Sequence, residues 1–132
     1  MTPALLFTAI VASFLAATGL LRYRDKQRAS RRTGLGFEDF VSCFSDEDIP
    51  LYKLSEVYNY FQNWQSVKNF PVLPDDDLYK VFGIVDEDVD DTVIELANRW
   101  HVKLPPTFEG LRPVRTVADI VHLLNQLPPE ND

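Results

Sequence analysis

The sequence of 132 residues is poor in the residue types that build catalytic, metal and disulfide sites. Its one cysteine, Cys43, excludes an intramolecular disulfide and fits a reducing compartment. Because Cys43 lies in an apolar pattern, we expect a buried structural thiol and not a nucleophile. The two histidines lack a paired nucleophile and metal-ligand spacing; we expect His101 to end a helix and His122 to lie off an apolar stripe. The sequence therefore predicts neither an enzyme nor a bound cofactor.

The acidic run after Gly83 also lacks the requirements of a calcium loop. Asp86, Asp88 and Asp90 alternate as at the start of an EF-hand. That loop needs glycine at its sixth position and a bidentate acid at its twelfth, where this chain has Asp91 and Ala97. We therefore expect no calcium site here.

Alternating apolar and polar runs long enough for a β-strand are missing, and there is no internal repeat. Apolar residues recur instead at helical spacing, which predicts an all-α domain. We expect helices near residues 37–44, 51–64, 87–101 and 117–127. In the second of these, the stripe expected to be buried is Leu51, Leu54, Val57, Tyr58, Phe61 and Trp64.

Several helix ends carry recognisable signals. Pro50 opens the second helix, where a missing N–H costs nothing. One aspartate of residues 75–77 is expected to cap a short turn that ends at Gly83. Thr116 and Asp119 resemble a capping box at the start of the last helix.

Charge is absent from the apolar stretch at residues 3–21. Its 19 residues would form a helix of about 28 Å, close to the thickness of bilayer hydrocarbon. Six basic residues follow it, opposed only by Asp25: Arg22, Arg24, Lys26, Arg28, Arg31 and Arg32. By the positive-inside rule this cluster stays in the cytoplasm, so we expect a single-pass anchor with the C-terminal domain cytoplasmic.

Two alternatives to an anchor are less consistent with the sequence. A cleaved secretory signal carries basic residues before its apolar stretch, whereas here they follow it, and residues 17–19 make a poor cleavage site. A buried soluble helix would need a partner on every side, because the stretch is apolar all round. We therefore predict an anchor at residues 1–21, a basic juxtamembrane linker at 22–36 and a helical domain at 37–132.

The charges of these segments are opposite. Residues 1–36 hold six basic and one acidic side chain, a net +5, whereas residues 37–132 hold seven basic and 19 acidic side chains, a net −12. An acidic domain repels the phosphate backbone, so we exclude nucleic acid as its partner. The basic residues from Arg22 to Arg32 are suited to anionic lipid headgroups.

The spacing of motifs in the acidic domain resembles that of acyl carrier proteins. Residues 74–79 and 82–84 resemble the loop and short turn before the central helix of that family. Residues 93–105 and 116–121 are similar to the apolar positions of the central helix and to the start of the last helix. The resemblance covers about half of the domain and implies a small helical bundle.

The reactive serine of that family is absent. Counted from Gly83, Asp86 stands where the family carries the serine that holds phosphopantetheine, and Glu87 where it carries leucine. No serine or threonine occurs from Gly83 to Asp91. A carboxylate cannot form the phosphodiester, so we expect no prosthetic group. The stretch resembles more closely a bacterial family of unknown function, related to acyl carrier proteins, that has an acidic run at this place. That resemblance implies a fold, and together with the predicted anchor it leads us to expect a bacterial inner-membrane location.

The resemblance also implies a docking face, because acyl carrier proteins dock basic patches of partner enzymes through acidic residues of the central helix. The matching residues here are Asp86, Glu87, Asp88, Asp90, Asp91 and Glu95. We therefore expect a non-catalytic protein-interaction module with a basic protein partner. A merely solvated acidic helix end remains an alternative. So does a protein that binds an acyl chain or a small apolar ligand between its helices.

Overall fold

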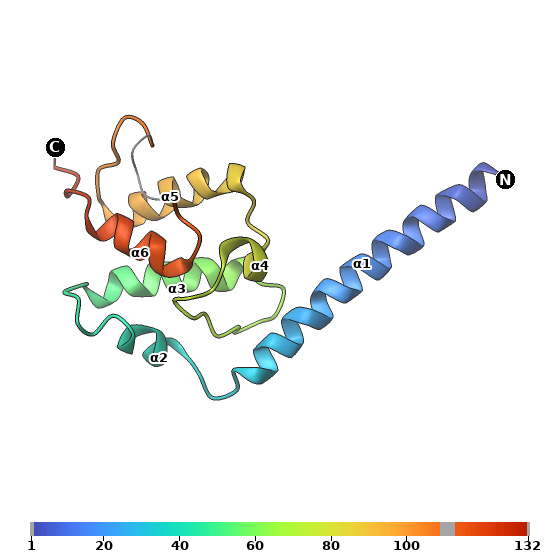
Figure 1. Cartoon of the computed structure of the whole chain (residues 1–132), viewed down its shortest axis with the longest axis horizontal. Helices are drawn as coiled ribbons and strands as arrows, with labels where there is room; N and C mark the ends of the chain where they lie inside the picture. The colour runs from blue at the N-terminus through green and yellow to red at the C-terminus, as the bar shows by residue number, and fades with distance from the viewer. Residues whose placement is uncertain (1, 109–112, 132) are drawn as a thin grey trace.

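The computed structural model describes residues 2–108 and 113–131, which form six helices and no strand (Figure 1). The helices are α1 (Pro3–Arg31), α2 (Phe37–Ser42), α3 (Leu51–Trp64), α4 (Leu78–Phe82), α5 (Asp86–Trp100) and α6 (Val117–Asn125). The predicted all-α class is confirmed. Met1 of the predicted anchor, and residues 109–112 and 132 of the predicted domain, lie outside the described residues.

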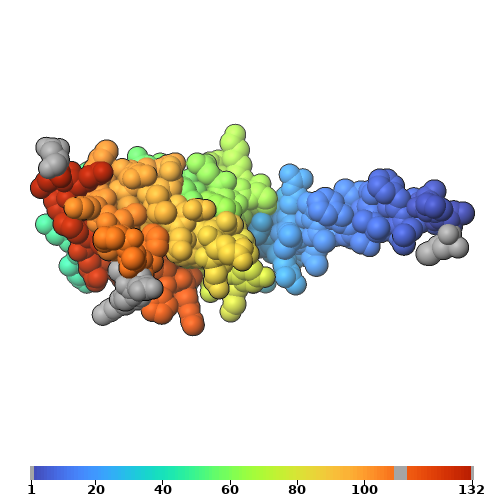
Figure 2. All heavy atoms as spheres, turned by 90° about the horizontal axis from the view of Figure 1, so that it is seen from above, coloured from blue at the N-terminus to red at the C-terminus, as the bar shows by residue number. Residues whose placement is uncertain are grey.

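Helix α1 is long and apolar enough to cross a membrane, with a mean hydropathy of 2.2 over its most apolar window. It projects from the bundle, and none of its residues is buried by the rest of the described chain (Figures 1 and 2). The described chain therefore does not bury α1 as a core helix. The helix also continues beyond Leu21 through most of the predicted linker and ends at Arg31. Gly34, which adopts a positive φ of 90°, lies just after this end.

The remaining helices pack around one apolar core. Helix α3 contacts α2, α5 and α6, and α5 also contacts α6. The largest fully buried side chains include Trp100, Phe40, Phe61, Phe70, Leu96, Ile120 and Leu124. The predicted stripe of α3 is wrong at its two ends, where Leu51 is 61% and Trp64 is 40% exposed. These are the first and last residues of α3, where the core no longer covers the helix.

Cys43 is exposed, so the predicted buried thiol is wrong. The apolar face of α2 and the turn after it points inward through Phe40 and Phe44, which are 0% and 4% exposed. Cys43 lies off that face, and its Sγ donates a hydrogen bond to the Asp39 carbonyl at 3.3 Å. The apolar residues around Cys43 therefore do not determine on which side of this segment the thiol lies.

The predicted helix ends are confirmed at α4 and α5. The Oδ1 atom of Asp77 accepts hydrogen bonds from the backbone N–H groups of Tyr79 at 3.0 Å and Lys80 at 2.8 Å, which caps α4. Gly83 ends α4 in the left-handed conformation, with φ of 71°. His101 ends α5 in the same conformation, with φ of 56°.

The predicted capping box of α6 is also formed. The Thr116 hydroxyl accepts from the Asp119 N–H at 3.1 Å, and Asp119 Oδ2 accepts from the Thr116 N–H at 3.0 Å. Burial acts to raise the pKa of Asp119, but the N–H groups of Arg115 and Thr116 outweigh it and hold the pKa below its usual value. The carboxylate is therefore ionised when it caps the helix.

Candidate partner-docking site

The six carboxylates predicted for partner binding lie along the first three turns of α5. Asp86, Glu87, Asp90, Asp91 and Glu95 are exposed, and Asp88 is half-buried. The opposite side of α5 carries Val93, Leu96, Ala97 and Trp100 into the core. The predicted site residues therefore lie on the solvent-facing part of α5; we call residues 86–91, which hold five of the six carboxylates, the acidic end of α5.

Local electrostatics explain why this helix tolerates so many acids. Val85 precedes α5 and has no side chain that can cap it. Asp86, Glu87 and Asp88 occupy the first turn, where the helix dipole favours negative charge. The acidic end therefore stabilises its own helix, a role that requires no partner.

Only the last of the six carboxylates is engaged by a basic side chain of the described chain. Arg99 Nε lies 3.0 Å from Glu95 Oε1, one helical turn away along α5, and Arg99 Nη1 lies 3.4 Å from Glu56 Oε2. Among residues 2–108 and 113–131, no lysine or arginine lies within ion-pair distance of residues 86–91. The charge of Glu95 is thus partly neutralised, whereas that of the acidic end is not neutralised by these residues.

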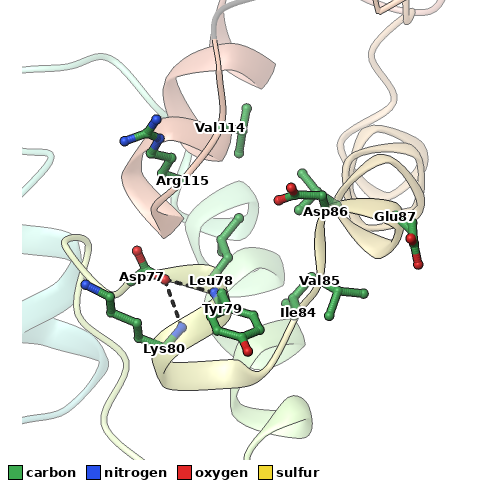
Figure 3. A pocket seen from close by; sticks show the side chains of 11 residues that line it. Asp77, Leu78, Tyr79, Lys80, Ile84, Val85, Asp86, Glu87, Val114 and Arg115 are labelled. Atoms are coloured by element: carbon green, nitrogen blue, oxygen red, sulfur yellow. Dashed lines mark hydrogen bonds between the residues drawn. The ribbon is translucent and has the colours of Figure 1, made fainter.

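An open cleft of about 640 Å³ adjoins the acidic end (Figure 3). Its walls come from α4, from the turn between α4 and α5, and from the segment before α6. The apolar residues lining it are Leu78, Tyr79, Ile84, Val85, Val89 and Val114. Figure 3 shows Val114 and Arg115 on one wall and Asp86 and Glu87 on another, with Lys80 on α4. The cleft therefore combines an apolar lining with charges of both signs.

Hydrogen bonds between distant segments bring Arg115 to this cleft. The Leu78 N–H donates to the Arg115 carbonyl at 2.9 Å, and the Val117 N–H donates to the Asp76 carbonyl at 3.1 Å. Sequence reasoning missed Lys80 and Arg115 as site residues. Neither carries a local signal, because their proximity depends on pairing between segments far apart in the chain.

The carboxylates of the acidic end supply negative charge and hydrogen-bond acceptors. Asp86 is the first residue of α5, and its exposed carboxylate cannot take the place of a serine hydroxyl in a phosphodiester. Residues 86–91 belong to a regular helix, which is incompatible with an EF-hand loop. In the described part of the chain, no group of three or more His, Cys, Asp or Glu side chains is arranged to hold a metal ion.

Two residues singled out in the sequence, His122 and Arg32, pair with carboxylates outside this site. His122 lies off the core face of α6, as predicted, and its Nε2 is 2.9 Å from Glu47 Oε1. Arg32, assigned above to the lipid-binding cluster, instead contacts Asp76 in the bundle. Its guanidinium is therefore engaged within the bundle, whereas the sequence predicted contact with anionic lipid headgroups.

No family model, curated protein or solved structure matches the chain. Functional assignment therefore depends on the geometry of these residues and on the sequence resemblance.

Proposed function

We propose that this chain is a membrane-anchored, non-catalytic interaction module whose acidic end of α5 docks a basic surface of a partner protein. The observation that carries the proposal is five carboxylates within six residues, on the solvent side of a helix whose other side is fixed in the core. Complementary charges of this kind chiefly raise the rate and specificity of association. The partner we expect is therefore basic.

The resemblance to acyl carrier proteins supports the same surface. In that family the acidic face of the central helix meets partner enzymes, and α5 occupies the corresponding place in this sequence. Asp86 replaces the serine, so the bundle would keep the docking surface of a carrier and lack its prosthetic group. We propose a carrier-like bundle that is recognised but carries no cargo.

We also propose that α1 spans the bacterial inner membrane and that residues 22–132 lie in the cytoplasm. Residues 3–21 of α1 carry no charge and are apolar on all faces, and no part of the described chain buries them. The basic residues lie only on the C-terminal side of the apolar run. Anionic headgroups are suited to Arg22, Arg24 and Lys26, which are exposed.

We expect a fluorescent-protein fusion at the C-terminus to be bright in membrane fractions and an alkaline-phosphatase fusion at the same position to be inactive. The reason is that the basic cluster keeps its side of α1 in the cytoplasm. Gel mobility of the membrane-bound fusion also reports whether residues 1–21 are retained. An active phosphatase fusion without fluorescence would overturn the orientation, and loss of the first 21 residues would indicate a cleaved signal.

A protein that binds an acyl chain or small apolar ligand is the second candidate. The cleft beside the acidic end favours it, because about 640 Å³ with an apolar lining lies in the range of ligand pockets. The cleft is open to solvent, however, and the core behind it is filled by buried side chains. The geometry therefore favours docking over enclosure of a ligand.

Mass spectrometry distinguishes a cargo-free interaction module from a protein that carries or binds an acyl chain. After incubation with a broad-specificity phosphopantetheinyl transferase and coenzyme A, we expect the denatured mass to be unchanged, because Asp86 stands in the serine position. Under native conditions we expect no acyl ligand beyond the phospholipids that accompany the anchor. A serine-containing acyl carrier protein serves as the positive control for transfer. An added phosphopantetheine, or a stoichiometric bound acyl chain, would contradict the cargo-free module.

A further inference from the structure

A buried ion pair joins the end of the α1 segment to the bundle. Arg32 Nη2 lies 2.5 Å from Asp76 Oδ1, and Arg32 Nη1 donates to Asp76 Oδ2 at 2.8 Å. The two side chains are only 14% and 4% exposed. A two-point arginine–carboxylate pair fixes the relative orientation of its partners, and burial removes the screening that weakens surface pairs.

Further contacts restrain both members of the pair. Arg32 Nη1 also donates to the Pro71 carbonyl at 2.8 Å, and the guanidinium carbon lies 5.1 Å from the centre of the Phe70 ring. Asp76 Oδ2 accepts a second hydrogen bond, from the Leu73 N–H at 2.8 Å. Arg32 thus binds several groups of the segment between α3 and α4 at once.

The segment preceding Arg32 also touches the bundle. Asp25 Oδ2 accepts a hydrogen bond from the Ser66 hydroxyl at 2.8 Å, and Ala29 packs against the core. Residues 22–31 remain helical and extend the apolar run by about 15 Å. No flexible linker therefore separates the apolar part of α1 from the contact at Arg32.

The contact determines which part of the bundle faces α1. In Figure 1, the side of the bundle that carries α4 and the start of α5 faces α1. We propose that the Arg32–Asp76 pair joins α1 and the bundle into one rigid unit, which holds α4 and the start of α5 on the side of the bundle that faces the anchor.

The consequence for docking rests on the proposed membrane placement of α1. In an anchored chain, the acidic end of α5 and its cleft are presented beside the lipid surface and not on the far side of the domain. A partner then meets the site in the layer where basic membrane-flanking segments lie. The rigid unit itself depends only on the contacts of Arg32 and Asp76.

Distances between spin labels test the rigid unit in the full chain. The chain is placed in phosphatidylethanolamine–phosphatidylglycerol nanodiscs with Cys43→Ser, because Cys43 is exposed. One label replaces Lys26 on α1, and the other replaces either Lys80 on α4 or Asn98 on α5, all of them exposed positions. We expect a single narrow distance distribution for each pair, with the shorter distance for the label at residue 80.

Removing the charge of Asp76 should loosen the unit. We expect Asp76→Asn to broaden both distributions at least twofold, whereas Asp75→Asn, which removes a neighbouring exposed carboxylate, should leave them unchanged. Circular dichroism verifies that each variant is folded; Arg32→Lys, which keeps the charge and loses the two-point geometry, provides a second variant.

Broad distributions in the unmodified chain overturn the proposal, as do Asp76→Asn and Arg32→Lys distributions as narrow as those of Asp75→Asn. The outcome is independent of docking, since no partner is present in the measurement. A rigid unit that captures no partner would reject the proposed function alone, and a flexible unit that captures one would reject only this inference.

Discussion

Replacement of Trp100 by alanine is expected to lower the free energy of unfolding by about 3–5 kcal/mol. The side chain is 1% exposed and is among the largest in the core. Its Nε1 donates to the Lys53 carbonyl at 2.9 Å, and the Lys53 ammonium lies 5.1 Å from the ring centre. Truncation therefore removes apolar burial, a hydrogen bond and a cation–π contact that join α5 to α3.

The second tryptophan supplies a matched control. Trp64 is 40% exposed at the end of α3, so Trp64→Ala should change the free energy of unfolding by less than about 1 kcal/mol. Denaturant unfolding of the detergent-solubilised chain, followed by circular dichroism, compares the two variants. Equal losses of stability would contradict the assignment of Trp100 to the core and of Trp64 to its edge.

Helix positions were predictable because their signals are local. The apolar spacing predicted a helix near residues 87–101, and α5 spans Asp86–Trp100. Thr116 and Asp119 are three residues apart, so their capping box could be recognised before any tertiary contact was known. These features depend on neighbours within about one turn of the helix.

Side-chain environments were harder to predict because they depend on tertiary packing. Cys43 shares a segment with inward-pointing phenylalanines but lies on the outer side of it. Leu51 and Trp64 fall on the correct stripe but beyond the covered part of α3. Arg32 and Asp76 are separated by 44 residues, and no sequence spacing indicates that they pair.

For the candidate site, the sequence predicted the acidic face but not its surroundings. The carboxylates were identified from one contiguous run, which the structure places on the exposed side of α5. Glu95 differs from the other five carboxylates because Arg99 pairs with it. Lys80 and Arg115 line the cleft because α4 packs against the segment before α6, which no local sequence pattern indicates.

Neutralising three carboxylates of the acidic end is expected to slow partner association sharply with little loss of structure. Changing Asp88, Asp90 and Asp91 to asparagine preserves side-chain volume and leaves the buried face of α5 intact. Loss of favourable interaction with the helix dipole should cost only about 1–3 kcal/mol for the three charges together. The association rate and its dependence on salt should fall, because both arise from charge complementarity.

A control variant tests whether the effect depends on where the three negative charges are removed or only on how many are removed. Asp46, Asp48 and Asp75 are exposed acidic residues elsewhere on the bundle. Changing these three to asparagine gives the same net charge as the variant at the acidic end. Circular dichroism should show the same helical content for both variants and for the unmodified chain.

The most direct test is capture of partners by the intact chain from solubilised inner membranes at a series of salt concentrations. The docking proposal predicts that the unmodified chain and the Asp46, Asp48, Asp75 variant recover the same proteins, with recovery falling as salt rises. It predicts that the Asp88, Asp90, Asp91 variant recovers little of them even at low salt. Equal recovery and equal salt dependence for all three proteins would show that the acidic end of α5 is only a solvated surface.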